Sequence, residues 1–310
     1  MIIITDSKEY SETIFTITEK WRTNTTNENL PIINKIIPKL FQTDNLFFAE
    51  IESDSLWKYA FIVNHSPISQ FTSLIELSKD NPDLPSGILC LANSGDNFKG
   101  YRNRSWISLA GNIHLSAYLK PNQIVDHFHI GFTILSAISV IEALDKIIGL
   151  EKKASIKWVN DIFIDNRKVA GVLTQTKTLG NEVTDLFIGI GVNVNETPEL
   201  ENDLVIKKAT SIKTHINSIN HLDISSIFNN LLASLTKNYE NLLDGNYNKI
   251  IDAYRIRSNV LGKNITVYSD PIKGEPQIIN NGKVISIGNN LELFLENNNN
   301  PVVKGRIVLG

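Results

Sequence analysis

The sequence predicts an α+β protein with a mixed, largely antiparallel sheet flanked by helices, followed by a small all-β unit. Three observations lead to this prediction. Short strand-like runs cluster at residues 155–176, and the Asp-Asn-Arg turn at 165–167 is typical of an antiparallel hairpin. A long apolar helix is expected at residues 124–150. After residue 258 only short strand-like runs with Gly and Asn turns remain, which is typical of a small barrel or sandwich.

The other expected elements alternate along the chain. Runs of β-branched and aromatic residues bounded by polar turns predict strands at residues 2–4, 47–51, 56–63, 88–92, 112–119 and 186–194. Apolar residues at helical spacing predict helices at residues 7–21, 71–78, 223–243 and 246–257.

The composition is that of a soluble globular protein. Of the 310 residues, 42% are apolar and 20% are charged. The net charge of −3 gives no overall basic footprint for nucleic acid. Cys90 is the single cysteine, so the chain has no internal disulfide and no thiolate zinc site, which fits a reducing compartment. The N-terminus does not resemble a signal peptide, and charged residues interrupt the helix at 124–150, so we expect a cytoplasmic protein and a buried core helix.

The first segment that could form part of a functional site is the expected strand at residues 186–195. Strand alternation places Gly189, Gly191 and Asn193 on one face and aliphatic residues on the other. Two glycines in a strand indicate that something approaches the backbone closely. That neighbour is either a ligand or a packed helix or strand.

The second segment, at residues 155–173, contains two lysines and an aspartate near a strand junction. Lys157 and Lys168 could contact a phosphate, and Asp161 could bind Mg²⁺ as a hard oxygen ligand. The competing interpretation is a solvated lysine at a hairpin edge and a structural ion pair.

The third segment, at residues 94–106, is a loop with three basic residues, two glycines and Trp106 at its end. A flexible basic loop is suited to closing over an anionic ligand, and the alternative is an ordinary solvated loop. The chain contains no P-loop or Rossmann glycine motif, so neither type of nucleotide site is supported.

Together these segments resemble the biotin–protein ligase family. The family's K-W-P-N-D motif is similar to residues 157–161, and its R-K-[LV]-A-G-[IV]-L motif is similar to residues 167–173. Its G-[IL]-G-[IV]-N-[VM]-N motif is similar to residues 189–195, and its W-x-S-P-x-G-N motif is similar to the run that begins at Trp106.

The resemblance implies a domain organisation. Residues 46–257 would form a class II synthetase-like catalytic domain, and residues 258–310 an SH3-like β-barrel. Residues 1–45 would be an N-terminal extension, in which we expect no helix-turn-helix.

The resemblance also implies a two-step activity. Biotin and ATP, with Mg²⁺, would form biotinyl-5′-AMP, and a lysine of a biotin carboxyl carrier domain of a carboxylase would then accept the biotin. Neither DNA nor a membrane is an expected partner, and a homodimer is compatible with the family.

The resemblance implies roles for the residues of this chain that match the family's motifs. The catalytic set implied by the resemblance is Lys168, Lys157, Asp161 and Arg102, with Asp161 also the implied metal ligand. The implied biotin-binding set is Ser69, Gln70, Lys99, Gly100, Trp106, Lys168 and Gly171. The implied nucleotide-binding set is Lys99, Arg102, Arg104, Asn160, Gly189, Gly191 and Asn193.

Leu109 replaces a proline and His114 a tyrosine of the family pattern, and two further departures, at Tyr101 and Gly95, concern the expected biotin site. Tyr101 stands where the family has an arginine, and Arg102 would supply that charge after a one-residue shift. Gly95 stands where the family has a biotin-contacting glutamine. Two alternatives therefore stay open: a lipoate or octanoate ligase-like acyltransferase, and a non-catalytic paralogue that binds nucleotide or a carrier protein.

Overall fold

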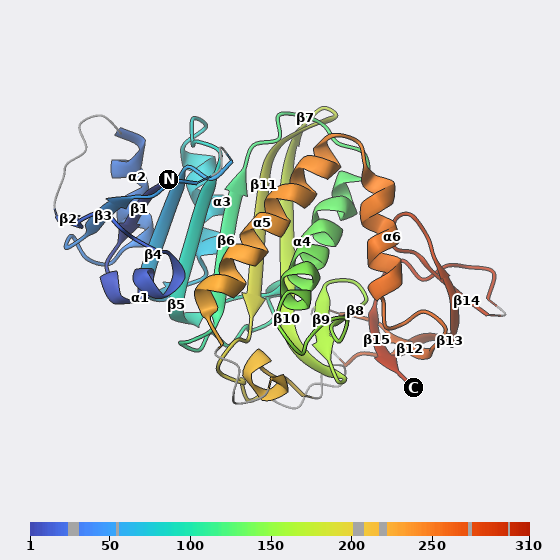
Figure 1. The fold of residues 1–310 in the computed structure, drawn as a ribbon. Helices are drawn as coiled ribbons and strands as arrows, with labels where there is room; N and C mark the ends of the chain where they lie inside the picture. Colours follow the sequence, from blue (N-terminus) through green and yellow to red (C-terminus); the bar gives the residue numbers. More distant parts are fainter. Residues whose placement is uncertain (24–30, 54–55, 201–207, 217–221, 272–274, 297) are drawn as a thin grey trace.

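A large sheet forms the centre of the protein in the computed structural model (Figure 1). The structure describes residues 1–310 except 24–30, 54–55, 201–207, 217–221, 272–274 and 297. The strands of this sheet are β1 (Ile2–Thr5), β2 (Arg22–Thr23), β3 (Phe47–Glu50), β4 (Tyr59–Ile68), β5 (Ile88–Asn97), β6 (Ile113–Leu119), β7 (Gln123–Ile124), β8 (Ser155–Lys157), β9 (Asp161–Ile164), β10 (Arg167–Leu179) and β11 (Glu182–Val192).

The strand order is β2-β3-β1-β4-β5-β6-β11-β10-β9-β8, and β7 pairs with β11. The β1–β4 and β4–β5 pairs are parallel, whereas the other pairs of the large sheet are antiparallel. The predicted mixed, largely antiparallel sheet is therefore confirmed.

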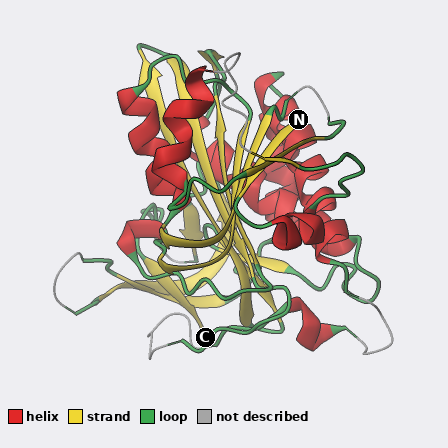
Figure 2. Cartoon of the chain, turned by 90° about the vertical axis from the view of Figure 1, so that its left-hand side faces the viewer, coloured by secondary structure: helices red, strands yellow, loops and turns green. Residues whose placement is uncertain are grey.

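Helices cover both faces of the large sheet, as Figure 2 shows. They are α1 (Lys8–Ile14), α2 (Pro31–Leu40), α3 (Gln70–Asp80), α4 (Phe128–Asp145), α5 (Ile224–Leu243) and α6 (Tyr247–Arg257). Buried residues of α1, α4, α5 and α6 form one apolar cluster with the sheet, and those of α2 and α3 form a second cluster on the opposite face.

Helix α4 is the central core helix. Gly131 lies against α5 and α6: a Cβ atom at this position would be 3.2 Å from Leu242 and 3.5 Å from Tyr247. Within the described residues, α4 is the one helix long and apolar enough to cross a membrane, and 67% of it is buried inside the protein. The prediction of a buried core helix is confirmed.

The hairpin predicted at residues 165–167 joins β9 to β10. Asp165 and Asn166 have φ values of 49° and 59°, which are the left-handed conformations that this type of tight turn requires. The turn starts an antiparallel pairing that, after a one-residue register shift between Lys168 and Ala170, places Gly171 opposite Asp161. It thereby brings two of the predicted site segments together.

Several element boundaries differ from the predictions. Strand β5 extends to Asn97, five residues beyond the predicted end, because its polar residues still pair with β4. Helix α4 begins at Phe128 and not at residue 124, since His127 has a left-handed backbone (φ 53°). Helix α2 was not predicted.

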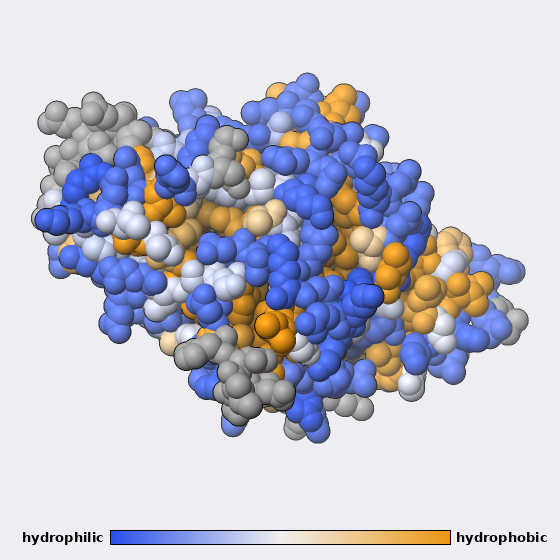
Figure 3. Space-filling view, in the orientation of Figure 1, coloured by the Kyte–Doolittle hydropathy of each residue, from blue (hydrophilic) through white to orange (hydrophobic). Residues whose placement is uncertain are grey.

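The C-terminal residues form a second, antiparallel sheet with strands β12 (Asn264–Tyr268), β13 (Ile278–Ile287), β14 (Leu293–Leu295) and β15 (Arg306–Leu309). Its order is β14-β13-β12-β15, and no described pairing joins β14 to β15, so closure into a barrel is not confirmed. Its buried residues belong to the same apolar cluster as α4. Other apolar side chains of this sheet are exposed, and orange atoms gather over it in Figure 3.

The N-terminal strand β1 lies inside the large sheet, between β3 and β4. Strands β1 and β2, which precede residue 45, therefore contribute to the large sheet. The division of the chain at residues 45 and 258, and the expected lack of a repressor domain, stay predictions.

Replacement of Leu135 by Ala tests the role of α4. Leu135 is fully buried in the core. We expect the free energy of unfolding to fall by about 2–5 kcal/mol, because the substitution removes apolar contacts and leaves a cavity. Urea denaturation measures this change. The control is Ile148→Ala, at a side chain that is 72% exposed, for which we expect a change within about 0.5 kcal/mol. Equal effects of the two substitutions would contradict this account of α4.

Candidate active site

A cavity of about 490 Å³ opens on the face of the large sheet that is covered by α3. Its walls come from α3, from the segment between β5 and β6, and from the ends of β9, β10 and β11. The predicted site residues that line it are Ser69, Lys99, Gly100, Arg104, Trp106, Asn160, Asp161, Lys168, Gly171, Gly189, Gly191 and Asn193. The structure thus brings together residues from all three predicted segments.

Three predicted site residues do not line the cavity. Gln70 follows Ser69 in α3, and both polar atoms of its buried amide lack a hydrogen-bond partner among the described residues. Lys157 is 4% exposed, and its Nζ lies 5.4 Å from the centre of the Phe163 ring. The guanidinium group of Arg102 contacts Asp270. The proposed roles of these three residues stay predictions.

The central polar contact of the site is the ion pair between Lys168 and Asp161. Lys168 Nζ lies 2.5 Å from Asp161 Oδ1, and both side chains are 17% exposed. A Cβ atom on Gly171 would lie 3.2 Å from Lys168 Nζ and 3.5 Å from Asp161 Oδ1. The absence of a side chain at Gly171 therefore leaves the space in which the pair forms.

Lys168 keeps hydrogen-bonding capacity after pairing with Asp161. An ammonium group has three donors, and the pair occupies one of them. The same Nζ lies 5.5 Å from the centre of the Trp106 ring, within the range of a cation–π contact. The lysine is thus held at a defined position with donors left for an anion.

Asn193 is a buried residue of the cavity lining and has an unsatisfied side-chain oxygen. Its Nδ2 donates to the carbonyl of Thr210 at 3.0 Å, which fixes the orientation of the amide. Its Oδ1 is buried and has no hydrogen-bond partner among the described residues. Such an orphaned acceptor is costly unless a ligand or water satisfies it. Together with the Asp161 carboxylate it gives the hard oxygen donors that suit Mg²⁺ bound to a phosphate.

Aromatic rings occupy the space beside the two strand glycines. A Cβ atom on Gly191 would lie 2.1 Å from the Trp106 ring, and one on Gly189 would lie 3.2 Å from the Phe71 ring. The glycines allow these rings to pack flat on β11. The groups that approach the two glycines most closely are therefore aromatic side chains of the protein, as the packing interpretation expects. Both glycines also line the cavity.

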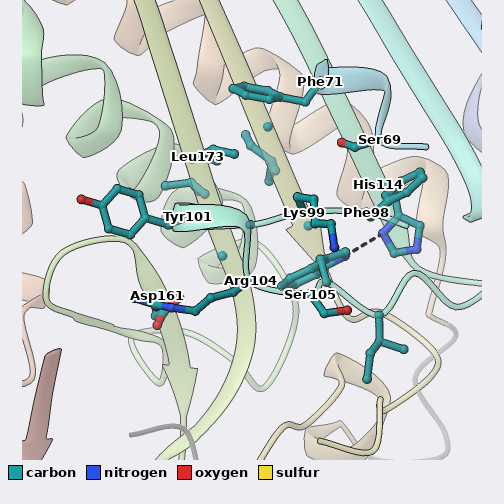
Figure 4. Close-up of a pocket in the computed structure, with 18 of the residues that line it drawn as sticks. Ser69, Phe71, Phe98, Lys99, Tyr101, Arg104, Ser105, His114, Asp161 and Leu173 are labelled. Carbon is teal, nitrogen blue, oxygen red and sulfur yellow. Dashed lines mark hydrogen bonds between the residues drawn. The ribbon is translucent and has the colours of Figure 1, made fainter. Parts of the chain in front are cut away.

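His114 is a cavity residue that the sequence analysis did not assign. Its Nδ1 accepts a hydrogen bond from Trp106 Nε1 at 3.3 Å (Figure 4), and its Nε2 faces the carbonyl of Leu109 at 3.0 Å. These partners require a neutral ring with its proton on Nε2. Burial lowers the pKa of His114 to about 4, which agrees with that state. Position 114 lies opposite Gly191 on β6, and strand alternation was the signal that could have identified it.

Phe98 fills the space beside Gly95. A Cβ atom at Gly95 would lie 2.2 Å from a carbon of the Phe98 ring and 2.6 Å from the Ser66 carbonyl oxygen. The ring of Phe98 also makes an edge contact with His114, with the two ring centres 5.9 Å apart. A larger side chain at position 95, such as glutamine, would require Phe98 to move.

The cavity has an apolar wall and a charged end. Phe71, Phe98 and Leu173 contribute to the wall, whereas Lys168, Asp161 and Arg104 contribute to the charged end. Figure 4 shows Phe71 and Asp161 at opposite ends of the view. This arrangement suits a ligand with an apolar body and a carboxylate, next to a second anion.

Comparisons with known proteins agree with this geometry. Residues 69–193 match the model of the biotin/lipoate A/B protein ligase family. The cavity lies almost entirely within the matched residues. The central part of the chain is therefore similar to this family.

Two curated proteins named as ligases are similar to the chain. The chain is 28% identical to the bifunctional ligase/repressor BirA of Bacillus subtilis over 171 residues, which are 55% of this chain and 51% of BirA. It is 30% identical to the biotin–[acetyl-CoA-carboxylase] ligase of Paracoccus denitrificans over 125 residues, which are 40% of this chain and 51% of that enzyme. The chain therefore spans about half the length of the curated relatives that it matches. By these similarities the chain resembles biotin–protein ligases.

The fold is shared with solved biotin–protein ligases. The structure of the Aquifex aeolicus enzyme in complex with biotin and ATP matches with a TM-score of 0.63 and 20% identity, over 82% of this chain and 99% of that chain. The Leishmania major enzyme in complex with biotin matches with a TM-score of 0.52 and 14% identity, over 81% and 97% of the two chains. In each comparison, the shared fold includes most of this chain and nearly all of the other enzyme.

Titration of His114 provides a pH test of the site. The unfolded chain protonates this histidine near its ordinary pKa of 6.5, whereas the folded protein protonates it near 4. Between these values the unfolded state binds more protons, so stability falls as the pH is lowered. The maximum loss from this group is about 3 kcal/mol, at 1.36 kcal/mol per unit.

Urea denaturation across this pH window measures the effect. We expect His114→Gln to show a weaker loss of stability on acidification than the wild-type protein. His129→Gln, at an exposed histidine, is the control variant for the loss of an imidazole. An unchanged pH dependence in His114→Gln would contradict the assignment of a buried neutral ring.

Substitution of Gly191 by Ala tests the packing of Trp106 on β11. The new methyl group would overlap the indole, so we expect Trp106 to move, its fluorescence to change, and the free energy of unfolding to fall by about 1–3 kcal/mol. Gly189→Ala is the matched control, because its contact with Phe71 is longer and requires a smaller shift. If both variants had the stability and fluorescence of the wild-type protein, the close contact between Trp106 and Gly191 would be contradicted.

Proposed function

We propose that this protein is an ATP-dependent biotin–protein ligase that forms biotinyl-5′-AMP and transfers biotin to a lysine of a carboxylase carrier domain. The observation that carries the proposal is the Lys168–Asp161 pair at the charged end of a cavity with an apolar wall. The names of the relatives and the biotin and ATP bound by the Aquifex aeolicus enzyme give independent support.

In the first step, a biotin carboxylate oxygen attacks the α-phosphorus of ATP. A new P–O bond forms, the bond to the β-phosphate breaks, and pyrophosphate leaves. The reacting groups are both anionic, and two unit charges at about 4 Å repel by about 4 kcal/mol at an effective dielectric constant of about 20. Lys168 offsets this repulsion with the donors that Asp161 leaves free. Lys157, which is in register with Asp161, would add a second positive charge.

In the second step, the neutral ε-amine of the acceptor lysine attacks the acyl carbon of the adenylate. The amide C–N bond forms, the bond to the AMP oxygen breaks, and AMP leaves with its negative charge. The proton lost by the amine goes to a base, and Asp161 is the carboxylate at the charged end of the cavity.

The remaining residues would bind the two substrates. Ser69, Gln70, Lys99, Gly100, Trp106 and Gly171 are assigned to biotin, and Lys99, Arg102, Arg104, Asn160, Gly189, Gly191 and Asn193 to the nucleotide. Asp161 and Asn193 Oδ1 fit Mg²⁺, which neutralises phosphate charge when it is bound with ATP.

Replacement of Lys168 by Ala tests this function. The assay combines the protein, MgATP, labelled biotin and an apo carrier domain, and measures label on the carrier. We expect activity to fall by about 100-fold or more, because a preorganised charge at the reacting centre is lost. The control is Lys177→Ala on the same strand; Lys177 bonds to Ser78 and does not line the cavity. Full activity in Lys168→Ala would contradict the proposal.

The same assay distinguishes the alternatives. The matched family includes lipoate ligases, so labelled lipoate is tested beside labelled biotin. Labelling by lipoate alone would assign the chain to the acyltransferase alternative. No adenylate and no transfer with either acid would indicate a non-catalytic binding protein.

A further inference from the structure

Asp270 connects the C-terminal sheet to the basic loop at the cavity. It lies two residues after β12, and its side chain is 14% exposed. Its Oδ2 lies 2.6 Å from Arg104 Nη2 and 3.5 Å from Arg102 Nε. Its backbone carbonyl accepts a further hydrogen bond from Arg102 Nη1. One residue of the C-terminal sheet therefore contacts two arginines of the loop.

The loop at residues 99–105 has an unfavourable backbone conformation at its tip. Arg102 and Asn103 have φ values of 55° and 60°, in the left-handed region. The base of the loop is closed by the Gly100 N–H, which donates to the Arg104 carbonyl at 2.7 Å. Residues other than glycine rarely adopt successive left-handed conformations unless surrounding contacts hold them. Among the described residues, Asp270 is the partner outside the loop that binds these arginines.

The contact orients the arginines without cancelling the positive charge of the loop. One carboxylate faces two guanidinium groups, and Lys99 adds a further positive charge at the cavity. An arginine has five N–H donors, and Arg104 uses one nitrogen, Nη2, toward Asp270. Arg104 lines the cavity, so its other donors are available to an anionic ligand there.

We propose that Asp270 is a positioning residue that holds the loop at residues 99–105 in the geometry that receives an anion at the cavity. The C-terminal sheet then acts on the site through this one side chain. The identification of the anion as the triphosphate of ATP rests on the proposed function. The opposite model is that Asp270 competes with the anion for the arginines and must be displaced.

Tryptic cleavage of the ligand-free protein tests the loop directly. In Asp270→Asn we expect cleavage after Arg102 or Arg104 to accelerate by roughly tenfold, the change given by about 1.4 kcal/mol of lost local stability. Mass spectrometry identifies the cut. Asp270→Glu should restore much of the protection. Asp252→Asn, which removes a surface pair with Arg255 in α6, is the control and should not change the rate.

MgATP binding, measured by calorimetry, tests the consequence for the ligand. We expect the dissociation constant to rise by roughly tenfold in Asp270→Asn, with kcat at saturating MgATP within about twofold of the wild-type value, because Asp270 orients the loop and does not touch the reacting atoms.

Three results would overturn the proposal: unchanged cleavage in Asp270→Asn, faster cleavage with unchanged affinity, or tighter MgATP binding, which identifies Asp270 as a competitor. If the wild-type protein bound no MgATP, the proposed function would fail, while the cleavage comparison would still decide whether Asp270 holds the loop.

Discussion

The ion pair between Lys168 and Asp161 is the interaction on which the site depends. Both side chains project from one hairpin, so the turn between β9 and β10 and the register shift after Lys168 together determine whether they can meet. Gly171 lies opposite Asp161 in this register and leaves the space that the pair occupies. Lys168 lines the cavity, and the pair leaves some of its donors free. The local strand geometry thus holds the Lys168 ammonium group at a defined position in the cavity lining.

The rest of the cavity is shaped by aromatic packing around a neutral histidine. Trp106 lies on the bare surface of Gly191, contacts Lys168 and donates to His114. His114 in turn packs against Phe98, which fills the space next to Gly95. A change at one of these residues therefore alters its neighbours, since close-packed side chains transmit a displacement. The part of the cavity around Trp106 and His114 is consequently determined by packing as much as by hydrogen bonds.

The sequence was sufficient to predict the features that depend on local order. The sheet type, the hairpin, the core helix and the shared face of Gly189, Gly191 and Asn193 follow from periodicity and turn chemistry. It was not sufficient for contacts between distant segments. The Arg104–Asp270 pair joins residues 166 positions apart, and no local pattern indicates it. The sequence pattern also did not show which groups cover Gly189 and Gly191. The three-dimensional packing shows that they are the aromatic rings of Phe71 and Trp106.

Formation of the adenylate is the most direct test of the central claim that this cavity activates a carboxylic acid with ATP. The measurement is mass spectrometry of the small molecules bound to the wild-type protein after incubation with biotin and MgATP in the absence of any acceptor. We expect biotinyl-5′-AMP, in an amount close to that of the protein, together with released pyrophosphate. Unreacted biotin and ATP after saturating incubation, in a protein confirmed to be folded, would contradict the account.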